Sequence, residues 1–579
     1  MASSSRPTVA EAYLRALKSR GVDWIFGNAG TDFAPIIEAL AAGESRAAGE
    51  AGAPDDFPRA VEILHETVAV AMAHGYWLMT GRPQCAMVHV NVGAANALMG
   101  VINASRGKVP LLFASGRTPI TEHGRLGSRN IPIHWGQEMF DQGGMLREFV
   151  KWDNELRAGE QVVDLVDRAL AITQAEPRGP VYLSLPREVL AEPLPDGFVF
   201  SPEPTVTVPT PPHPDPAAIA RAAEVLAAAE HPLIITSDGG ADLFDALSAF
   251  ALRFAVPVVQ FWRTSTAIAT DHPFYAGEVP MPLLAGADAV VVLDTMVPWL
   301  PGRMPLRPDA TVIQIGPDPL FDGVPVRSFS AALAITSSPA PAVRALAAFL
   351  DAAGWAEADA TAARRAALVP RLAARRMAEV ATGAEPGQAP MTPDFLAATL
   401  SDVIGPDAVV VNELGVATGP LELTRHDSFF GPPVSAGLGW GGGAALGVKL
   451  AAPDRLVVWA TGDGSYVLSN PAACHHAAAA LGLGLLTVVA DNRVWNAVRR
   501  STIALYPGGA AAAGADMPLA SLAPAPDYPK LAEAYGGYGQ HVEDPAQLRA
   551  ALEKAVEHTR RGHQALVSVH VSTPDAAHN

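Results

Sequence analysis

The chain has 579 residues, of which 49% are hydrophobic and 17% charged, and its formal net charge is −18. A chain of this length needs more than one hydrophobic core, and its composition argues against a disordered protein. The negative charge disfavours nucleic acid and anionic membranes as partners. The two cysteines do not indicate a disulfide framework or a zinc site. The lack of a signal peptide or a long apolar run predicts a cytoplasmic protein.

The first third of the chain alternates between runs typical of strands and runs typical of helices. Strands are expected within residues 21–28, 83–93, 110–116 and 179–186. A helical pattern begins at Glu66, where a charged residue facing a core would need a partner, although the helix dipole also favours a glutamate in a first turn. His89 lies on a strand just before a polar turn, where a histidine can shuttle protons or be purely structural.

Two proline- or glycine-rich stretches divide the chain. Residues 199–216 and 379–392 have weak patterns, which leaves segments 1–195, 217–378 and 392–579 as expected domains. The second and third segments repeat the alternation of short β-branched runs with alanine-rich helical runs. The sequence therefore predicts an α/β protein with three doubly wound parallel sheets, each covered by helices on both faces.

A glycine-rich run in the third segment has the spacing Gly437-x-Gly439-x-x-Gly442. This spacing matches the fingerprint of dinucleotide-binding folds, which requires a preceding strand. The residues before it, FFGPPVS, do not form a clear strand pattern. The glycine spacing still leaves an oxidoreductase that binds NAD or FAD as one functional hypothesis.

A Gly-Asp-Gly turn closes the strand-like run RLVVWATG and is the most informative motif of the chain. The 26 residues 465–490 separate Gly464 from Asp491, enough for one helix and one strand of a parallel crossover. Asp463 and Asn492 then fall at the carboxyl ends of neighbouring strands, where open α/β sheets bind ligands. Their oxygens suit Mg²⁺ or Ca²⁺, and the glycines allow the backbone to approach a diphosphate.

The Gly-Asp-Gly turn and the later Asp-Asn pair resemble the diphosphate-binding motif of thiamine diphosphate (ThDP) enzymes, in which the second pair is Asn-Asn. The resemblance implies that Asp463, Asn492 and the main-chain oxygen of Val494 hold Mg²⁺. It also implies that the diphosphate lies against Gly462, Gly464 and Ser465. Asp491 departs from the family pattern, at a position that is not a ligand there.

The same family carries a glutamate at the start of a helix in its first domain, and Glu66 matches it. The resemblance implies that Glu66 hydrogen-bonds N1′ of the cofactor's aminopyrimidine, with the glutamate coming from a partner subunit. Leu438 matches the bulky residue that bends the cofactor, and the main-chain oxygen of Ala436 would accept from N4′. Gly30 and Asn96 are further expected cofactor contacts.

The whole chain resembles ThDP enzymes of the acetolactate synthase, pyruvate oxidase and benzoylformate decarboxylase type. The resemblance implies a pyrimidine-binding domain (1–195), a central Rossmann-like domain (217–378) and a diphosphate-binding domain (392–579). FGNAGT and residues 149–155 are similar to benzoylformate decarboxylase, so Thr31 and His89 match its substrate-facing serine and one active-site histidine. The second histidine of that enzyme has no counterpart in the central segment. The segment 135–141 is instead similar to the Gln-Glu segment of oxidases and synthases.

The resemblance implies a ThDP- and Mg²⁺-dependent 2-oxo acid decarboxylase and carboligase that joins its product to a carbonyl acceptor. A simple decarboxylase that releases an aldehyde is the main alternative, and a non-catalytic ThDP-fold protein a third. FAD is not expected, since the central DTMVPW departs from the flavin-contacting segments of acetolactate synthases. The expected assembly is a homodimer or homotetramer, and the segment 496–514 is expected to help choose the substrate.

Overall fold

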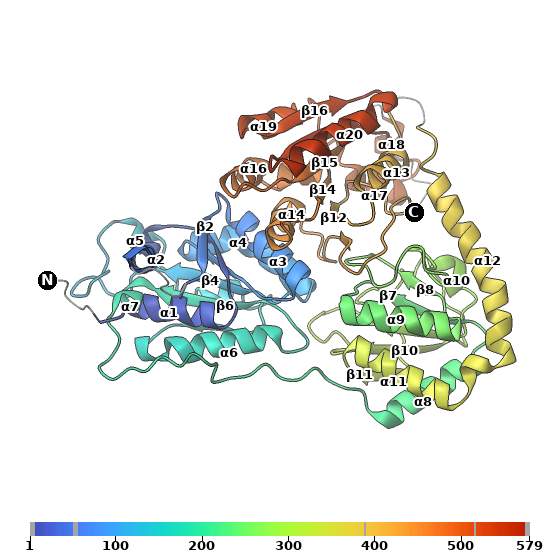
Figure 1. Ribbon diagram of the computed structural model, residues 1–579, viewed down its shortest axis with the longest axis horizontal. Helices are drawn as coiled ribbons and strands as arrows, with labels where there is room; N and C mark the ends of the chain where they lie inside the picture. The colour runs from blue at the N-terminus through green and yellow to red at the C-terminus, as the bar shows by residue number, and fades with distance from the viewer. Residues whose placement is uncertain (1–5, 50–55, 387–389, 515–516, 574–579) are drawn as a thin grey trace. The chain divides into compact units, whose positions relative to one another are not determined.

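The computed structural model describes residues 6–49, 56–386, 390–514 and 517–573, and contains three parallel sheets (Figure 1). Every strand pairing in the three sheets is parallel, as expected when helices connect successive strands. Among the described residues, no helix combines the length and apolar character needed to cross a membrane. The predicted α/β class with three parallel sheets is therefore confirmed.

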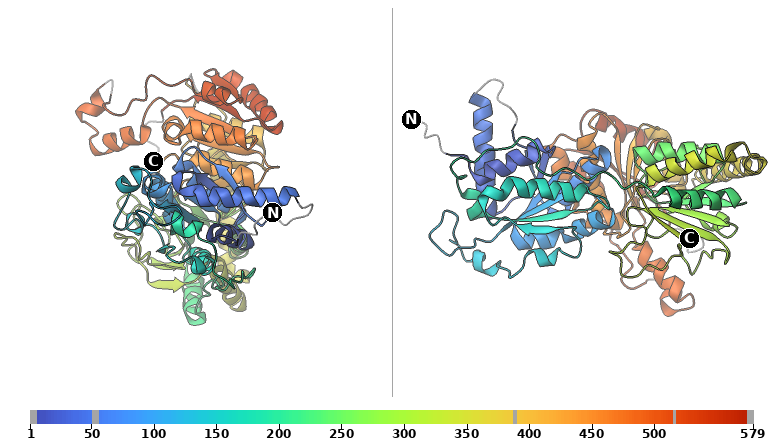
Figure 2. Two further views of the ribbon diagram at one scale, coloured as in Figure 1. Left: turned by 90° about the vertical axis from the view of Figure 1, so that its left-hand side faces the viewer. Right: turned by 90° about the horizontal axis from the view of Figure 1, so that it is seen from below.

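The first sheet has the strand order β2-β1-β3-β4-β6-β5. Its strands are β1 (Trp24–Asn28), β2 (Arg59–Glu62), β3 (Cys85–Val88), β4 (Leu112–Arg117), β5 (Asp153–Glu155) and β6 (Val181–Pro186). Helices α1 (Val9–Ser19), α2 (Ala34–Gly49) and α6 (Val162–Gln174) contribute apolar side chains to a core on one face of the sheet. In the right-hand view of Figure 2, α6 lies across these strands.

Helices α3 (Glu66–Thr80) and α4 (Val90–Arg106) also connect strands of the first sheet. Residues 435–453 and 466–483, from the last third of the chain, belong to the same compact unit. They include α14 (Trp440–Ala451) and α16 (Pro471–Ala480), and α14 lies along α3 (Figure 1). A Cβ on Gly443 would lie 2.6 Å from the Cβ of Ala71, and one on Gly447 would overlap the backbone of Met72. The glycine-rich run therefore lets two helix backbones pack closely.

The second compact unit comprises residues 211–434, 454–465 and 484–579. Its first sheet has the order β11-β10-β9-β7-β8, with β7 (Pro232–Thr236), β8 (Val258–Gln260), β9 (Ala289–Leu293), β10 (Thr311–Gly316) and β11 (Leu333–Thr336). Helices α8 (Pro216–Ala228), α9 (Ala241–Phe254), α11 (Pro339–Ala352) and α12 (Asp359–Ala381) pack on it, with the short α10 (Met281–Leu284) at its edge. This core is almost wholly aliphatic and aromatic.

The other sheet of this unit has the order β13-β12-β14-β15-β17-β16. Its strands are β12 (Val409–Glu413), β13 (Phe429–Phe430), β14 (Val457–Gly462), β15 (Leu486–Asp491), β16 (Tyr538–Val542) and β17 (Ala565–His570). Helices α13 (Pro393–Ile404) and α20 (Pro545–Arg560) pack on one face, and α19 (Tyr528–Ala534) packs on β16 and β17. Helices α17 (Asn496–Leu505) and α18 (Ala510–Ala513) have no buried residues and project away from the sheet (Figure 2).

The two predicted breaks differ in outcome. Residues 199–215 have no helix or strand, and α8 begins at Pro216 with Asp215 as its cap. The second predicted break began at residue 379, but α12 continues to Ala381. The amphipathic pattern of the helix therefore extends into the first residues of that stretch. Residues 387–389 of that stretch lie outside the described residues.

Candidate functional site

The first candidate cluster lies at the carboxyl ends of two neighbouring strands of the third sheet. Strand β14 ends at Gly462, the short helix α15 (Asp463–Leu468) follows at once, and β15 ends at Asp491. The register pairs Gly462 with Ala490, so the residues after each strand emerge side by side. The predicted crossover between the Gly-Asp-Gly turn and the Asp-Asn pair is therefore present.

The predicted metal ligands lie in one small network. Asp463 Oδ1 accepts from the N–H of Gly464 at 2.8 Å, and Oδ2 accepts from the N–H of Arg493 at 2.7 Å. Asn492 Oδ1 accepts from the N–H of Val494 at 3.0 Å. Asp463 is thus hydrogen-bonded to the residue between the other two predicted ligands, which brings the three positions together. Ser465, in the first turn of α15, is buried.

Two buried carboxylates give this cluster its charge. Asp463 and Asp491 are 3% and 1% exposed, and Asp491 Oδ1 has no hydrogen-bond partner among the described residues. Burial raises the pKa of Asp463 to about 6, and the charge of Asp491 acts in the same direction. The nearest cation is Arg493, whose Nε lies 3.6 Å from Asp491 Oδ2. A buried pair of this kind is costly without a cation, so these oxygens fit a hard divalent ion such as Mg²⁺.

The second candidate cluster is built around Glu66, the first residue of α3. Glu66 is 9% exposed, and Asn96 Nδ2 donates to its Oε2 at 3.2 Å. His65 caps the helix by accepting from the N–H of Thr67 at 3.3 Å, and the Thr67 hydroxyl donates to the main-chain oxygen of Asn96 at 2.9 Å. The predicted residues Glu66 and Asn96 are therefore in direct contact. Gly93, in the first turn of α4, lies beside Glu66 Oε1.

His89 caps the junction between β3 and α4 and faces Asp32. Its Nδ1 forms a short hydrogen bond with Asp32 Oδ1, and its Nε2 lies 3.3 Å from the side-chain amide nitrogen of Gln137. A side chain on Gly30 would overlap the His89 ring, which explains a glycine there. The strand expected within residues 83–93 ends at Val88, and Asn91 lies in the first turn of α4, because the helix begins immediately after His89.

The predicted substrate-facing residue, Thr31, is exposed at the start of a short 3₁₀ turn (Thr31–Phe33). Its main-chain oxygen accepts from Arg187 Nη1 at 3.2 Å. A second imidazole, His134, is buried in the segment after β4, with Nδ1 accepting from the N–H of Asn130 at 3.2 Å. Burial, followed by the charges of Arg187 and other cations, lowers the pKa of His134. The lowered pKa disfavours the charged form of His134, so this residue is a weak candidate for a second proton donor.

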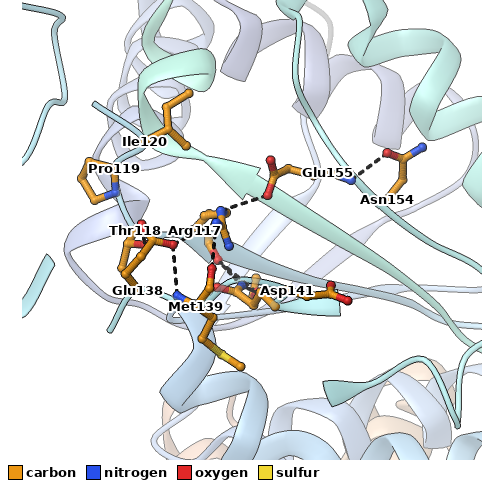
Figure 3. A network of polar contacts seen from close by, with 12 residues as sticks. Arg117, Thr118, Pro119, Ile120, Glu138, Met139, Asp141, Asn154 and Glu155 are labelled. Atoms are coloured by element: carbon orange, nitrogen blue, oxygen red, sulfur yellow. Dashed lines mark hydrogen bonds and ion pairs between the residues drawn. The ribbon is translucent and has the colours of Figure 1, made fainter. Parts of the chain in front are cut away.

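A network of ion pairs fixes the residue next to Gln137 (Figure 3). Glu138 Oε1 accepts from Arg117 Nη2 at 2.8 Å, and its Oε2 accepts from the Thr118 hydroxyl at 3.0 Å and pairs with Arg129. Arg117 also pairs with Glu155 at 2.9 Å. Two arginines and one hydroxyl thus hold the Glu138 carboxylate, which holds Gln137 at the His89 ring.

The loop that carries Leu438 is clamped by Asn103 of α4. Asn103 Oδ1 accepts from the Ser435 hydroxyl at 2.7 Å and from the N–H of Gly437 at 3.1 Å, while Nδ2 donates to the main-chain oxygen of Gly437 at 2.8 Å. Ala436 is exposed with a φ of 48°, and Leu438 is half-buried just before α14 begins. This loop follows no strand of useful length, so the context required of a dinucleotide fingerprint is absent here.

Three residues of the candidate site were not predicted from the sequence. Asp32 follows Thr31 in the chain, but its side chain contacts His89, which is 57 positions away. No local pattern marks a contact between residues so far apart. Asn103 is a fully buried amide in an otherwise apolar helix face, and that pattern could have marked it. Gln137 lies in the segment 135–141, whose Gln-Glu pair is similar to that of oxidases and synthases. Its contact with His89 could not be predicted from spacing along the chain.

Comparison with known proteins assigns all three segments to one family. Residues 7–145 match the N-terminal TPP binding domain of thiamine pyrophosphate enzymes, residues 219–346 the central domain and residues 415–569 the C-terminal TPP binding domain. TPP and ThDP are the same compound.

Similar proteins cover nearly the full length. A sulfoacetaldehyde acetyltransferase from Rhodobacter capsulatus is 25% identical over 97% of this chain and 94% of the relative. A benzoylformate decarboxylase from Pseudomonas aeruginosa is 26% identical over 95% and 96%. The crystal structure of benzoylformate decarboxylase from Polynucleobacter necessarius has the same fold, with a TM-score of 0.76, 21% identity and coverage of 98% and 99%. With the N-terminal, central and C-terminal domains present in that order, the chain belongs to the thiamine pyrophosphate enzyme family.

Proposed function

We propose that this protein is a ThDP- and Mg²⁺-dependent enzyme that decarboxylates a 2-oxo acid and joins the product to a second carbonyl compound. The observation that carries the proposal is the buried Asp463–Asp491 pair beside Asn492, a cluster of oxygens that suits a divalent cation. Magnesium held by Asp463, Asn492 and the main-chain oxygen of Val494 would bridge to the diphosphate. Gly462, Gly464 and Ser465 would then lie against the diphosphate.

Bound ThDP supplies a nucleophilic carbon and an electron sink for cleavage beside a carbonyl. The chain's own part is to bind, orient and move protons. Glu66, held by Asn96, would present a carboxylate oxygen to the aminopyrimidine, and Leu438 and Ala436 would fix the bend of the cofactor. His89 is the imidazole that exchanges a proton with the substrate, and Thr31 faces the substrate at the same edge of the first sheet.

A simple decarboxylase that releases an aldehyde is the second candidate. The similarity to benzoylformate decarboxylase and the matching positions of Thr31 and His89 favour it. The two functions differ in what happens after carbon dioxide leaves, since aldehyde release needs a proton and ligation needs an acceptor. Because burial lowers the pKa of His134, that imidazole is a poor second proton donor, which favours ligation.

An assay panel tests the proposal. Aliphatic and aromatic 2-oxo acids would be supplied with ThDP and Mg²⁺, with and without aldehyde or 2-oxo acid acceptors, and carbon dioxide, aldehyde and ligation products would be measured. Ligation at least as fast as aldehyde release supports the first candidate. Aldehyde alone, with every acceptor, supports the second, and no carbon dioxide from any 2-oxo acid contradicts both.

Substitution of His89 should separate the two outcomes. His89→Ala removes the imidazole that returns a proton, so we expect aldehyde release to fall by roughly 10²-fold, within the usual range for one acid–base group, and ligation to fall less. Product ratios measured at equal carbon dioxide release check this. Equal losses would place His89 before the two paths divide, and unchanged rates would make it structural.

The protein should be at least a homodimer. We expect Glu66 to act in the site of a partner subunit, as the resemblance to ThDP enzymes implies, and closed two-fold assemblies are the commonest solution. The segment between β4 and β5 supports this expectation, because it exposes large apolar side chains that a monomer seldom leaves in water: Leu126, Ile133, Trp135 and Phe140. Light scattering should give at least twice the chain mass of 60.3 kDa. An active monomer at assay concentration would contradict the prediction.

A further inference from the structure

Three segments of the first compact unit meet at the His89 ring. Asp32 comes from the 3₁₀ turn after β1, His89 from the end of β3, and Gln137 from the residue after helix α5 (Ile133–Gly136). Asp32 contacts Nδ1, and Gln137 lies 3.3 Å from Nε2. Each ring nitrogen therefore has one defined partner.

The partners decide which nitrogen carries the proton. An ionised carboxylate only accepts hydrogen bonds, so the short contact with Asp32 requires a proton on His89 Nδ1. The other nitrogen then has a free lone pair, which can accept from the amide N–H of Gln137. The two contacts agree on one tautomer, with Nδ1 protonated and Nε2 basic.

The Asp32 carboxylate is itself fixed in place. It is 2% exposed, and its Oδ2 accepts from the N–H of Val90 at 3.3 Å. A side chain on Gly116 of β4 would overlap Oδ2, so the glycine provides the space that the carboxylate fills. Arg187 interacts favourably with this charge. A buried carboxylate with this much support is expected to act through the group it touches, His89.

We propose that Asp32 is a positioning residue that holds His89 in the Nδ1–H tautomer, so that Nε2 can take up a proton from water and deliver it to the substrate after carbon dioxide has left. The inference rests on the proposed function for the identity of the substrate, but its structural part concerns the tautomer alone. When Nε2 gains a proton the ring becomes a cation, and the neighbouring Asp32 carboxylate stabilises that cation. When Nε2 gives this proton to the substrate, the starting tautomer is restored.

The substitution Asp32→Asn should reverse the tautomer. The N–H of Val90 needs an oxygen acceptor, so the asparagine carbonyl takes the place of Oδ2 and its amide group faces His89 Nδ1. That amide donates, so Nδ1 must become the acceptor and the proton moves to Nε2. Gln137 can then rotate its amide, since its Oε1 has no hydrogen-bond partner among the described residues. The variant keeps the shape of the site but loses the basic nitrogen, as when the aspartate of a Ser-His-Asp triad becomes asparagine.

The decisive experiment is nitrogen NMR of ¹⁵N-histidine-labelled full-length protein, without cofactor or substrate. The His89 signals would be assigned by their loss in His89→Ala. We expect the Nδ1–H form in the wild type and the Nε2–H form in Asp32→Asn. Asp196→Asn, which removes an exposed carboxylate of the same compact unit, should leave the tautomer unchanged. A wild type with the Nε2–H form, or an Asp32→Asn variant that keeps Nδ1–H, would overturn the inference.

Two further measurements keep the test independent of folding and of the reaction. Gln137→Leu should retain the Nδ1–H form, because Asp32 sets the tautomer; loss of that form would assign the role to Gln137 instead. With a 2-oxo acid that the assay panel identifies, aldehyde release by Asp32→Asn should fall by at least about 10²-fold. A reversed tautomer with an undiminished rate would overturn the catalytic part, whereas the expected tautomers in a protein that decarboxylates no 2-oxo acid would reject only the proposed function.

Discussion

Asp463→Ala should abolish cofactor binding while the protein remains folded. The substitution removes the carboxylate that a magnesium ion would share with Asn492, and neutral ligands alone bridge poorly to a diphosphate. We expect the affinity for ThDP, measured by calorimetry with saturating Mg²⁺, to fall by more than about 100-fold. Mutating a residue that only hydrogen-bonds to a metal ligand already lowers metal affinity by up to about 100-fold, and Asp463→Ala removes a ligand itself. The circular dichroism spectrum should not change.

The control for this experiment is Asp407→Ala. Asp407 belongs to the same compact unit, but its side chain is 91% exposed and lies at the start of β12, away from the carboxyl ends of the strands. The control should bind ThDP as the wild type does. Wild-type affinity in Asp463→Ala would reject the metal site, and equal losses in both variants would point to a general effect of charge.

Glu66→Gln should bind ThDP normally and yet lose turnover. Asn96 Nδ2 donates to one Glu66 oxygen, so the glutamine carbonyl will occupy that position and its amide group will take the place of the other oxygen. A donor then faces the aminopyrimidine where an acceptor is needed. We expect kcat to fall by at least about 10²-fold with little change in ThDP affinity.

The measurement pairs steady-state kinetics with calorimetry on the same preparation. Glu38→Gln, an exposed position on α2, is the matched control and should leave both quantities unchanged. A Glu66→Gln variant with near wild-type turnover would remove Glu66 from the mechanism. Loss of ThDP binding together with turnover would make Glu66 a binding residue.

The sequence predicts the central strands well and the edges poorly. Strands β12, β14, β15 and β17 are β-branched runs that are almost wholly buried, so their composition marks them. Strands β2 (Arg59–Glu62) and β16 (Tyr538–Val542) lie at sheet edges and are mostly exposed or half-buried. Without a buried face they carry no apolar pattern, and only pairing with a neighbour makes them strands.

The site divides in the same way. The proposed metal ligands are predictable because one crossover joins them, and its length is visible in the chain. Asp32 and His89 are 57 residues apart, and Asn103 and Gly437 are 334 apart, so those contacts depend on how the sheet and its helices assemble. The motif spacing therefore predicts a candidate cofactor site, while the residues that orient its side chains are visible only in the fold.

The close packing of α14 on α3 limits where the enzyme can be redesigned. A methyl group added to Gly75, Gly443 or Gly447 would meet backbone atoms of the opposite helix, which cannot rotate away. Mutant libraries aimed at new substrates should therefore leave this seam untouched.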